Sequence, residues 1–244
     1  RLCTGAYDFR RDGCPDTWGW VADLVNLGVC RPGEMLDPGN PMLSNEKLND
    51  LIGQTATNNG KDGCPPERLI HGACSQMVSG GGAGDPGTQE RADYVARNLF
   101  DEGYNTNYVA SWYLVRTGVK LTPVTQESSD PDNQVWNWDL PYLAGLEAST
   151  GTGADTAKGL GATQGPLTMR TLETSVVPSS NIPLIGCGSP GDPGEATCTH
   201  EVYSRDTDTT YVQTGDRLVE AFCDGPASYV ADNGIWIPDG DDAS

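Results

Sequence analysis

Eight cysteines constrain this 244-residue chain more than any other feature of its sequence. Their number is even, their spacing is irregular, and no two of them form a CxxC motif. A structural zinc site would need further ligands at short regular spacing, and the chain has only two histidines, His71 and His200. Disulfide bonds are therefore the favoured interpretation, and they predict an exported protein of the extracellular space or cell surface. The cysteines are Cys3, Cys14, Cys30, Cys64, Cys74, Cys187, Cys198 and Cys223.

All eight cysteines are expected to be oxidised. Eight cysteines can pair in about a hundred ways, so spacing alone gives only a preference. Short intervening segments favour Cys64 with Cys74 and Cys187 with Cys198, and the second bond would close a loop rich in glycine and proline. The remaining cysteines would then pair as Cys14 with Cys30 and Cys3 with Cys223.

The charge of the chain is strongly negative, with 34 acidic and 15 basic residues and a net charge of −19. Such a surface repels phosphate groups, so nucleic acid and anionic lipid are excluded as partners. It favours solubility and could attract divalent cations. No cofactor is required by any motif in the sequence.

Acidic clusters near turns are candidate calcium ligands, because calcium prefers several carboxylate and carbonyl oxygens. The candidate metal site is the cluster Asp239, Asp241 and Asp242 near the C-terminal end. Two other clusters, Asp130 to Asn133 and Asp206 to Asp208, have similar composition. None follows the EF-hand pattern, and solvated turns are the alternative interpretation.

The order of the predicted elements indicates an α+β fold with one globular domain over residues 1–244. Residues 1–103 are mainly helical, and residues 104–244 are mainly strands with long loops, forming an antiparallel sheet. Residues 2–10 resemble the last turns of a longer helix, which predicts further sequence before Arg1. The other predicted helices are 18–27, 44–52, 66–78 and 88–102, and the predicted strands lie within 104–119, 119–124, 182–186, 199–203, 209–213, 217–223 and 235–237.

Several phrases of the sequence, taken together and in order, carry a family resemblance. They are LVNLGVCRPGEMLDPGNP, YNTNYVASWYLVRTG, GPLTMRTLETSVVPSSNIPLIGCGSPGDPGEA and GDRLVEAFCDGPASY. They include Cys30 and Pro32 after the first head helix, the Asn107-Tyr108 pair, and the segment AFCDG at 221–225. These phrases cover about two thirds of the chain, and they resemble the heads of large type IV pilin-like and pseudopilin-G-like proteins of planctomycete-type bacteria.

The resemblance implies a structural subunit of an extracellular pilus or pseudopilus-like filament, with copies of itself as partners. In that family an apolar N-terminal helix anchors the subunit in the membrane before assembly and then packs in the filament core. That helix is missing from this numbering, so residues 2–10 would be its exposed end. The family also implies a calcium ion in a loop after about residue 190. The purpose of such a filament stays open.

Catalysis is not expected from the motifs of this chain. No G-x-S-x-G nucleophile elbow is present, and neither histidine lies beside one. The alternative to a filament subunit is a secreted adhesin module that binds calcium or carbohydrate without catalysis. Aromatic residues would supply its stacking surface, although core packing is the default interpretation of such residues. They are Trp112, Tyr113, Trp136, Trp138 and Trp236.

Overall fold

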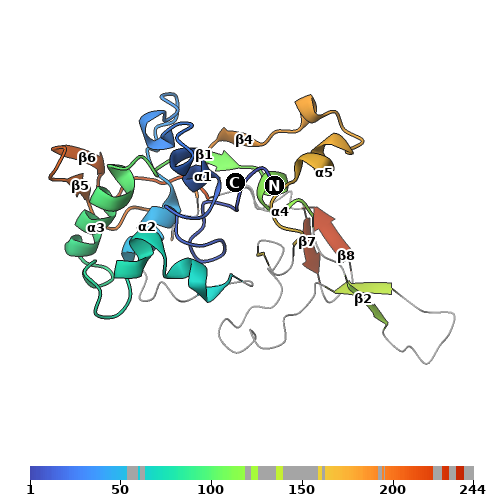
Figure 1. Ribbon diagram of the computed structural model, residues 1–244, viewed down its shortest axis with the longest axis horizontal. Helices are drawn as coiled ribbons and strands as arrows, with labels where there is room; N and C mark the ends of the chain where they lie inside the picture. Colours follow the sequence, from blue (N-terminus) through green and yellow to red (C-terminus); the bar gives the residue numbers. More distant parts are fainter. Residues whose placement is uncertain are drawn as a thin grey trace.

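The protein has an α+β fold of short helices and small antiparallel strand pairs, seen in a computed structural model (Figure 1). The structure describes residues 1–53, 60, 64–118, 122–125, 136–139, 159–160, 163–191, 194, 196–221, 227–230 and 235–238. Its helices are α1 (Trp20–Asn26), η1 (Pro32–Glu34), α2 (Glu46–Gly53), η2 (Pro66–Leu69), η3 (Gly72–Gln76), α3 (Gln89–Val95), η4 (Ala96–Phe100), α4 (Trp112–Arg116), α5 (Met169–Glu173) and η6 (Ser179–Asn181). Its strands are β1 (Tyr108–Ala110), β2 (Thr122–Thr125), β3 (Trp136–Asp139), β4 (Ile185–Cys187), β5 (Val202–Ser204), β6 (Thr209–Val212), β7 (Ala227–Val230) and β8 (Ile235–Pro238).

The predicted helix over 88–102 is confirmed by α3 and its continuation in η4. The Thr88 side chain accepts a hydrogen bond from the Arg91 amide at 3.3 Å and so caps the first turn. The helix continues through a π-helical turn to Phe100. Gly103, with a φ of 81°, then reverses the chain. This helical unit places its apolar side on the core, where Ala92, Val95, Ala96 and Leu99 are fully buried.

The predicted helix over 66–78 is broken into two short 3₁₀ helices, η2 and η3. Gly72, the first residue of η3, has a φ of 58°, and the carboxylate of Asp16 occupies the space where a side chain would begin. The Asp16 carboxylate accepts a hydrogen bond from the Ala73 amide at 2.6 Å. This tertiary contact, which the local sequence pattern could not reveal, stops an α-helix from continuing across Gly72.

Residues 2–10 do not form the end of a helix, so that prediction is wrong. The Asp8 carboxylate accepts a hydrogen bond from the Arg10 amide, and the Asp8 carbonyl accepts one from the Asp12 amide at 2.8 Å, which closes a tight turn. Tyr7 and Phe9 are completely buried in the core. The segment therefore belongs to the interior of the fold and contributes no exposed helix end.

The described strands form four separate two-stranded antiparallel pairs, β1–β4, β2–β3, β5–β6 and β7–β8, where a single sheet was expected. Part of the predicted strand region 104–119 is helical, because the Ser111 hydroxyl caps α4 by accepting from the Leu114 amide at 3.2 Å. The region 217–223 shows only isolated bridges, such as Val219 with Asn45, in its described residues. The other strand predictions overlap observed strands.

A buried ion pair connects the N-terminal segment to α4. Both side chains of Asp12 and Arg116 have zero exposure, and the Arg116 guanidinium donates two hydrogen bonds to the Asp12 carboxylate, at 2.8 and 2.6 Å. Burial raises the pKa of Asp12, and the contact with Arg116 opposes that rise. A paired geometry with two hydrogen bonds is the arrangement in which a buried ion pair can be tolerated.

A second group of charges lies close by. Burial alone would raise the pKa of Asp8, but Arg11, Lys47 and Arg116 outweigh it, and the pKa lies well below its usual range. The Arg11 guanidinium contacts the Asp8 carboxylate at 2.9 Å. The Lys47 ammonium contacts the carboxylates of Glu46 at 2.6 Å and Asp50 at 3.4 Å. Compensated charges therefore stabilise the interior of the fold together with apolar packing.

Breaking the Asp12–Arg116 pair should strongly destabilise the head. We expect Asp12→Asn to lower the free energy of unfolding by about 3–5 kcal/mol, because Arg116 keeps a charge in a dry interior with no compensating carboxylate at this position. Urea denaturation followed by circular dichroism would measure the loss.

The matched control is Glu34→Gln, which removes the partner of an exposed pair. The Arg31 guanidinium contacts the Glu34 carboxylate at 2.6 Å, but the two side chains are 42% and 61% exposed. Exposed pairs contribute about 0–1 kcal/mol, so this variant should unfold almost like the wild type. Equal small effects for both variants would contradict the structural role of the buried pair.

Candidate functional site

Among the cysteines that the structure describes, one disulfide is present, and it joins Cys14 to Cys74. Their Cα atoms are 5.8 Å apart although the two residues are separated by 60 positions. The predicted pairs Cys64–Cys74 and Cys14–Cys30 are therefore wrong. Short sequence separation misled the prediction, because the contact of Asp16 with the start of η3 folds Cys74 back onto the segment that contains Cys14.

The other described cysteines are free thiols in the structure. This differs from the expectation that all eight cysteines are oxidised, and it contradicts the predicted bond between Cys187 and Cys198. Burial raises the pKa of both Cys3 and Cys64 to about 12. Cys187 is exposed, and its thiol donates a hydrogen bond to the carboxylate of Asp37. Cys223 lies outside the described residues. The thiols are Cys3, Cys30, Cys64, Cys187 and Cys198.

The candidate calcium ligands Asp239, Asp241 and Asp242 lie outside the described residues, as does the cluster at 130–133. Within the part of the chain that the structure describes, no three acidic, cysteine or histidine side chains are grouped to hold a metal ion. In the cluster from Asp206 to Asp208, the Asp208 carboxylate accepts a hydrogen bond from the Tyr203 hydroxyl at 2.6 Å. This carboxylate therefore has a structural role in the β5–β6 turn.

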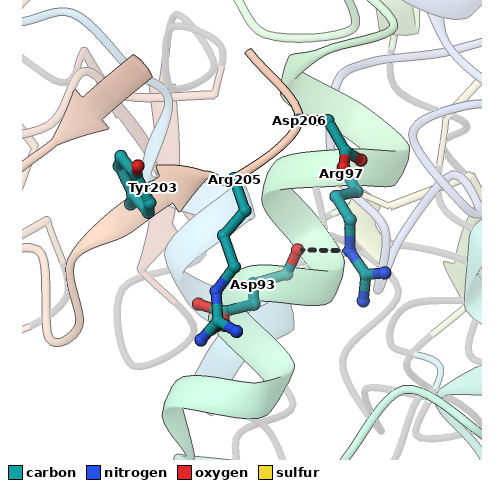
Figure 2. A pocket seen from close by; sticks show the side chains of 5 residues that line it. All are labelled: Asp93, Arg97, Tyr203, Arg205 and Asp206. Atoms are coloured by element: carbon teal, nitrogen blue, oxygen red, sulfur yellow. Dashed lines mark hydrogen bonds and ion pairs between the residues drawn. The ribbon is translucent and has the colours of Figure 1, made fainter. Parts of the chain in front are cut away.

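A small surface hollow lies between α3, η4 and the end of β5 (Figure 2). Its volume is about 160 Å³. The carboxylate of Asp93 contacts the Arg205 guanidinium at 3.1 Å, and the Asp93 carbonyl accepts from Arg97 Nε at 3.3 Å. The lining residues are Asp93, Arg97, Tyr203, Arg205 and Asp206, and Figure 2 shows the two arginines on either side of Asp93.

The charged residues of this hollow mainly stabilise the fold. Sites for small molecules usually enclose about 300–1,000 Å³, well above the volume available here. The two arginines already contact Asp93, so the polar groups of the hollow are directed to one another. The contact between Arg205 and Asp93 joins the end of β5 to α3. The hollow is therefore a weak candidate for a binding site.

The aromatic residues proposed as a sugar-binding surface do not form one among the described side chains. Trp112 is 8% exposed, and Tyr113 packs against the core. Both lie on α4, shortly after β1. The side chains of Trp136, Trp138 and Trp236 lie outside the description.

The most distinctive surface feature is an excursion over residues 168–187, here called the exposed arm, which contains α5, η6 and β4. Figure 1 shows it extending away from the helical body. None of its residues is fully buried, although Leu172 and Leu184 pack partly against the core. Val176 is 100% exposed. Its other exposed apolar residues are Met169, Val177 and Ile185.

The exposed arm is also nearly free of charge. Arg170 and Glu173 are its only charged residues, and residues 174–191 form the longest uncharged stretch of the chain. An apolar, neutral segment on the surface of a protein with a net charge of −19 is chemically suited to contact with another protein. The sequence already contained this signal, but the strand pattern alone did not indicate that the segment is exposed.

The comparisons with known proteins give no match: no protein-family model, no curated protein and no solved structure is similar to this chain at a significant level. The resemblance to pilin heads therefore stays a prediction. Each helix in the described ranges is too short or too polar to cross a lipid bilayer.

The disulfide and thiol assignment can be tested by mass spectrometry. After alkylation of the native protein at pH 8, we expect Cys187 to be labelled, because it is exposed. Cys3 and Cys64, with pKa values near 12, should react only after denaturation, because the thiolate is the reactive form. A non-reduced digest should contain a peptide that links Cys14 to Cys74. A link from either residue to Cys30 or Cys64 would contradict the structure.

Proposed function

We propose that this chain is a structural subunit of an extracellular pilus or pseudopilus-like filament, and that the exposed arm contacts a neighbouring copy. The observation that carries the proposal is the arm itself. Its apolar side chains Met169, Val176, Val177 and Ile185 are exposed, and contact with another subunit would remove them from water. Burial of apolar surface provides about 25 cal/mol for each Å².

Electrostatics supports the choice of the arm as the contact. Each head carries a net charge of −19, so two heads repel one another over most of their surface. Residues 174–191 carry no charge. A contact through them would therefore bring fewer negative charges close together than a contact through other parts of the surface. A subunit that assembles with itself needs such a neutral region.

The stability of the head is also suited to this role. The Cys14–Cys74 bond closes a loop of 60 residues, and a disulfide of this kind adds about 2–4 kcal/mol by restricting the unfolded chain. An oxidising location outside the cell would preserve it. Because residues 2–10 belong to the interior of the head, the proposal gives them no part in a filament core.

Electron microscopy of the full-length native protein tests the proposal with a matched pair of triple variants. Replacing Met169, Val177 and Ile185 by Asp should abolish filaments, because the arm becomes charged. Replacing Leu27, Val29 and Met35 by Asp adds the same charge at exposed apolar residues outside the arm and should leave filaments intact. Equal effects of the two triple variants would remove the arm from the assembly contact.

The same filaments should depend on ionic conditions. Salt screens charges beyond about 10 Å at 0.1 M, and calcium can bridge carboxylates on neighbouring heads. We therefore expect filaments to be more stable at 0.1 M salt or with calcium than at low ionic strength with a chelator, as judged by filament length and sedimentation. A full-length protein that stays monomeric and indifferent to both would overturn the proposal and favour the secreted adhesin that binds calcium or carbohydrate.

A further inference from the structure

The middle of the exposed arm, residues 168–182, forms hydrogen bonds only within itself in the described part of the chain. The Thr174 amide donates to the Arg170 carbonyl at 3.0 Å, and the Asn181 amide donates to the Pro178 carbonyl at 2.8 Å. The two helices of this segment, α5 and η6, have five and three residues, which is too short for a helix that is stable by itself. Local structure of this kind adds little resistance to opening.

The contacts that fix the arm lie at its two ends. At the start, the Leu167 amide donates to the Leu114 carbonyl at 2.9 Å, and at the other end the Leu184 carbonyl accepts from the Ser111 amide at 2.9 Å. Between these ends, Leu172 packs partly against the core. Segments with few buried apolar contacts and exposed hydrogen bonds open at low free energy while the core stays closed. We therefore expect the arm to open locally.

The centre of this segment exposes a peptide bond between two valines. Val176 is 100% exposed and Val177 is 43% exposed. Exposed loop tips are the preferred sites of proteolytic cleavage. The bond after Val177 precedes Pro178, whose ring fixes the backbone and removes the amide hydrogen, so that bond fits an extended protease cleft poorly. The Val176–Val177 bond is therefore the favoured one, and the side chain that selects it is small and aliphatic.

We propose that the Val176–Val177 peptide bond is a hydrolysis site for an endopeptidase with an apolar pocket for a small aliphatic side chain, and that the cleaved protein stays folded as one body. One water molecule is consumed. The Val176 carbonyl carbon becomes a carboxylate, and the Val177 nitrogen becomes an ammonium. This inference goes beyond the proposed function and does not depend on it.

The two products of this cleavage, residues 1–176 and 177–244, hold one another through main-chain contacts. Strand β4 of the second product pairs with β1 of the first. The Glu46 amide donates to the Val219 carbonyl, and the Val219 amide donates to the Ser44 carbonyl, both at 2.9 Å. These contacts do not involve the cleaved bond, so hydrolysis leaves them intact.

Side chains of both products also share one core. The Asp101 carboxylate accepts hydrogen bonds from the hydroxyls of Ser204 and Tyr211, both at 2.6 Å. The centre of the Tyr211 ring lies 5.0 Å from that of the Phe100 ring. Leu218, which is 1% exposed, belongs to the same buried cluster. Separation of the two products would expose this apolar surface to water, which is unfavourable, so the products remain together.

Limited digestion of the native protein with elastase, an endopeptidase that cleaves after small aliphatic residues, tests the site. We expect mass spectrometry to find a product that begins at Val177. Size-exclusion chromatography should elute that product together with the fragment that ends at Val176, whereas a reducing denaturing gel should separate them. A digest without a Val177 terminus, or products that separate in native buffer, would overturn the proposal.

A matched pair of variants tests which side chain selects the bond. Val176→Asp should slow cleavage at this bond by about tenfold or more, because a carboxylate is disfavoured in an apolar pocket. Val29→Asp adds the same charge at a valine that is 66% exposed outside the arm, and it should leave the rate unchanged. Equal rates for the two variants would remove Val176 as the recognised residue.

The dependence of the cleavage rate on urea distinguishes local opening from global unfolding. Cleavage through local opening should proceed at a nearly constant rate below the unfolding transition, once the rate is corrected for the effect of urea on elastase with a peptide substrate. Cleavage through global unfolding would rise steeply with urea, because the unfolded population does. A steep rise would contradict the local opening of the arm.

The outcomes also separate this inference from the proposed function. A protein that is cleaved after Val176 and never forms filaments would retain the cleavage site and remove the filament. Filaments from a protein whose monomer resists cleavage at this bond would retain the filament and remove the cleavage site.

Discussion

The contact between Asp12 and Arg116 is the interaction on which most of the head depends. It joins residues 104 positions apart in the sequence, and both side chains are completely buried. Gly5 lies against the same carboxylate, where any side chain would collide with Asp12 at 2.2 Å. A charged pair in a dry interior requires close packing around it, because water would otherwise compete for both groups. The N-terminal segment is therefore a central part of the core and not an extension from it.

The same anchor determines where the exposed arm leaves the head and where it returns. At its start, the Leu167 amide donates to the carbonyl of Leu114 in α4, and the Leu2 amide donates to the Leu167 carbonyl, at 2.9 and 2.7 Å. At its end, the Leu184 carbonyl accepts from the Ser111 amide. Both ends of the arm thus bind the β1–α4 region, which the buried Arg116 holds in place. A segment with a rigid base can present a neutral, apolar surface without requiring a core of its own.

Local features of the sequence predicted the elements whose ends are determined locally. Thr88 before a periodic apolar pattern correctly predicted the start of α3, since a side-chain cap is a property of a few neighbouring residues. The Ser111 cap of α4 is equally local, but it was overlooked because the aromatic residues around it favoured a strand. Tertiary contacts decided the rest. The Cys14–Cys74 bond depends on the fold of the chain around Gly72, which no spacing rule contains. The pairing of β4 with β1 joins segments that lie far apart in the sequence, and no local pattern contains it.

In the filament that we propose, two copies would meet through their outer surfaces, and charge limits where that can happen. Strong negative charge penalises most head-to-head contacts, because each copy carries −19. In the described part of the chain, the exposed arm is the surface segment with the longest uncharged run, since residues 174–191 carry no charge. In the filament that we propose, the composition that makes other surfaces repel would therefore direct the contact between copies to the arm.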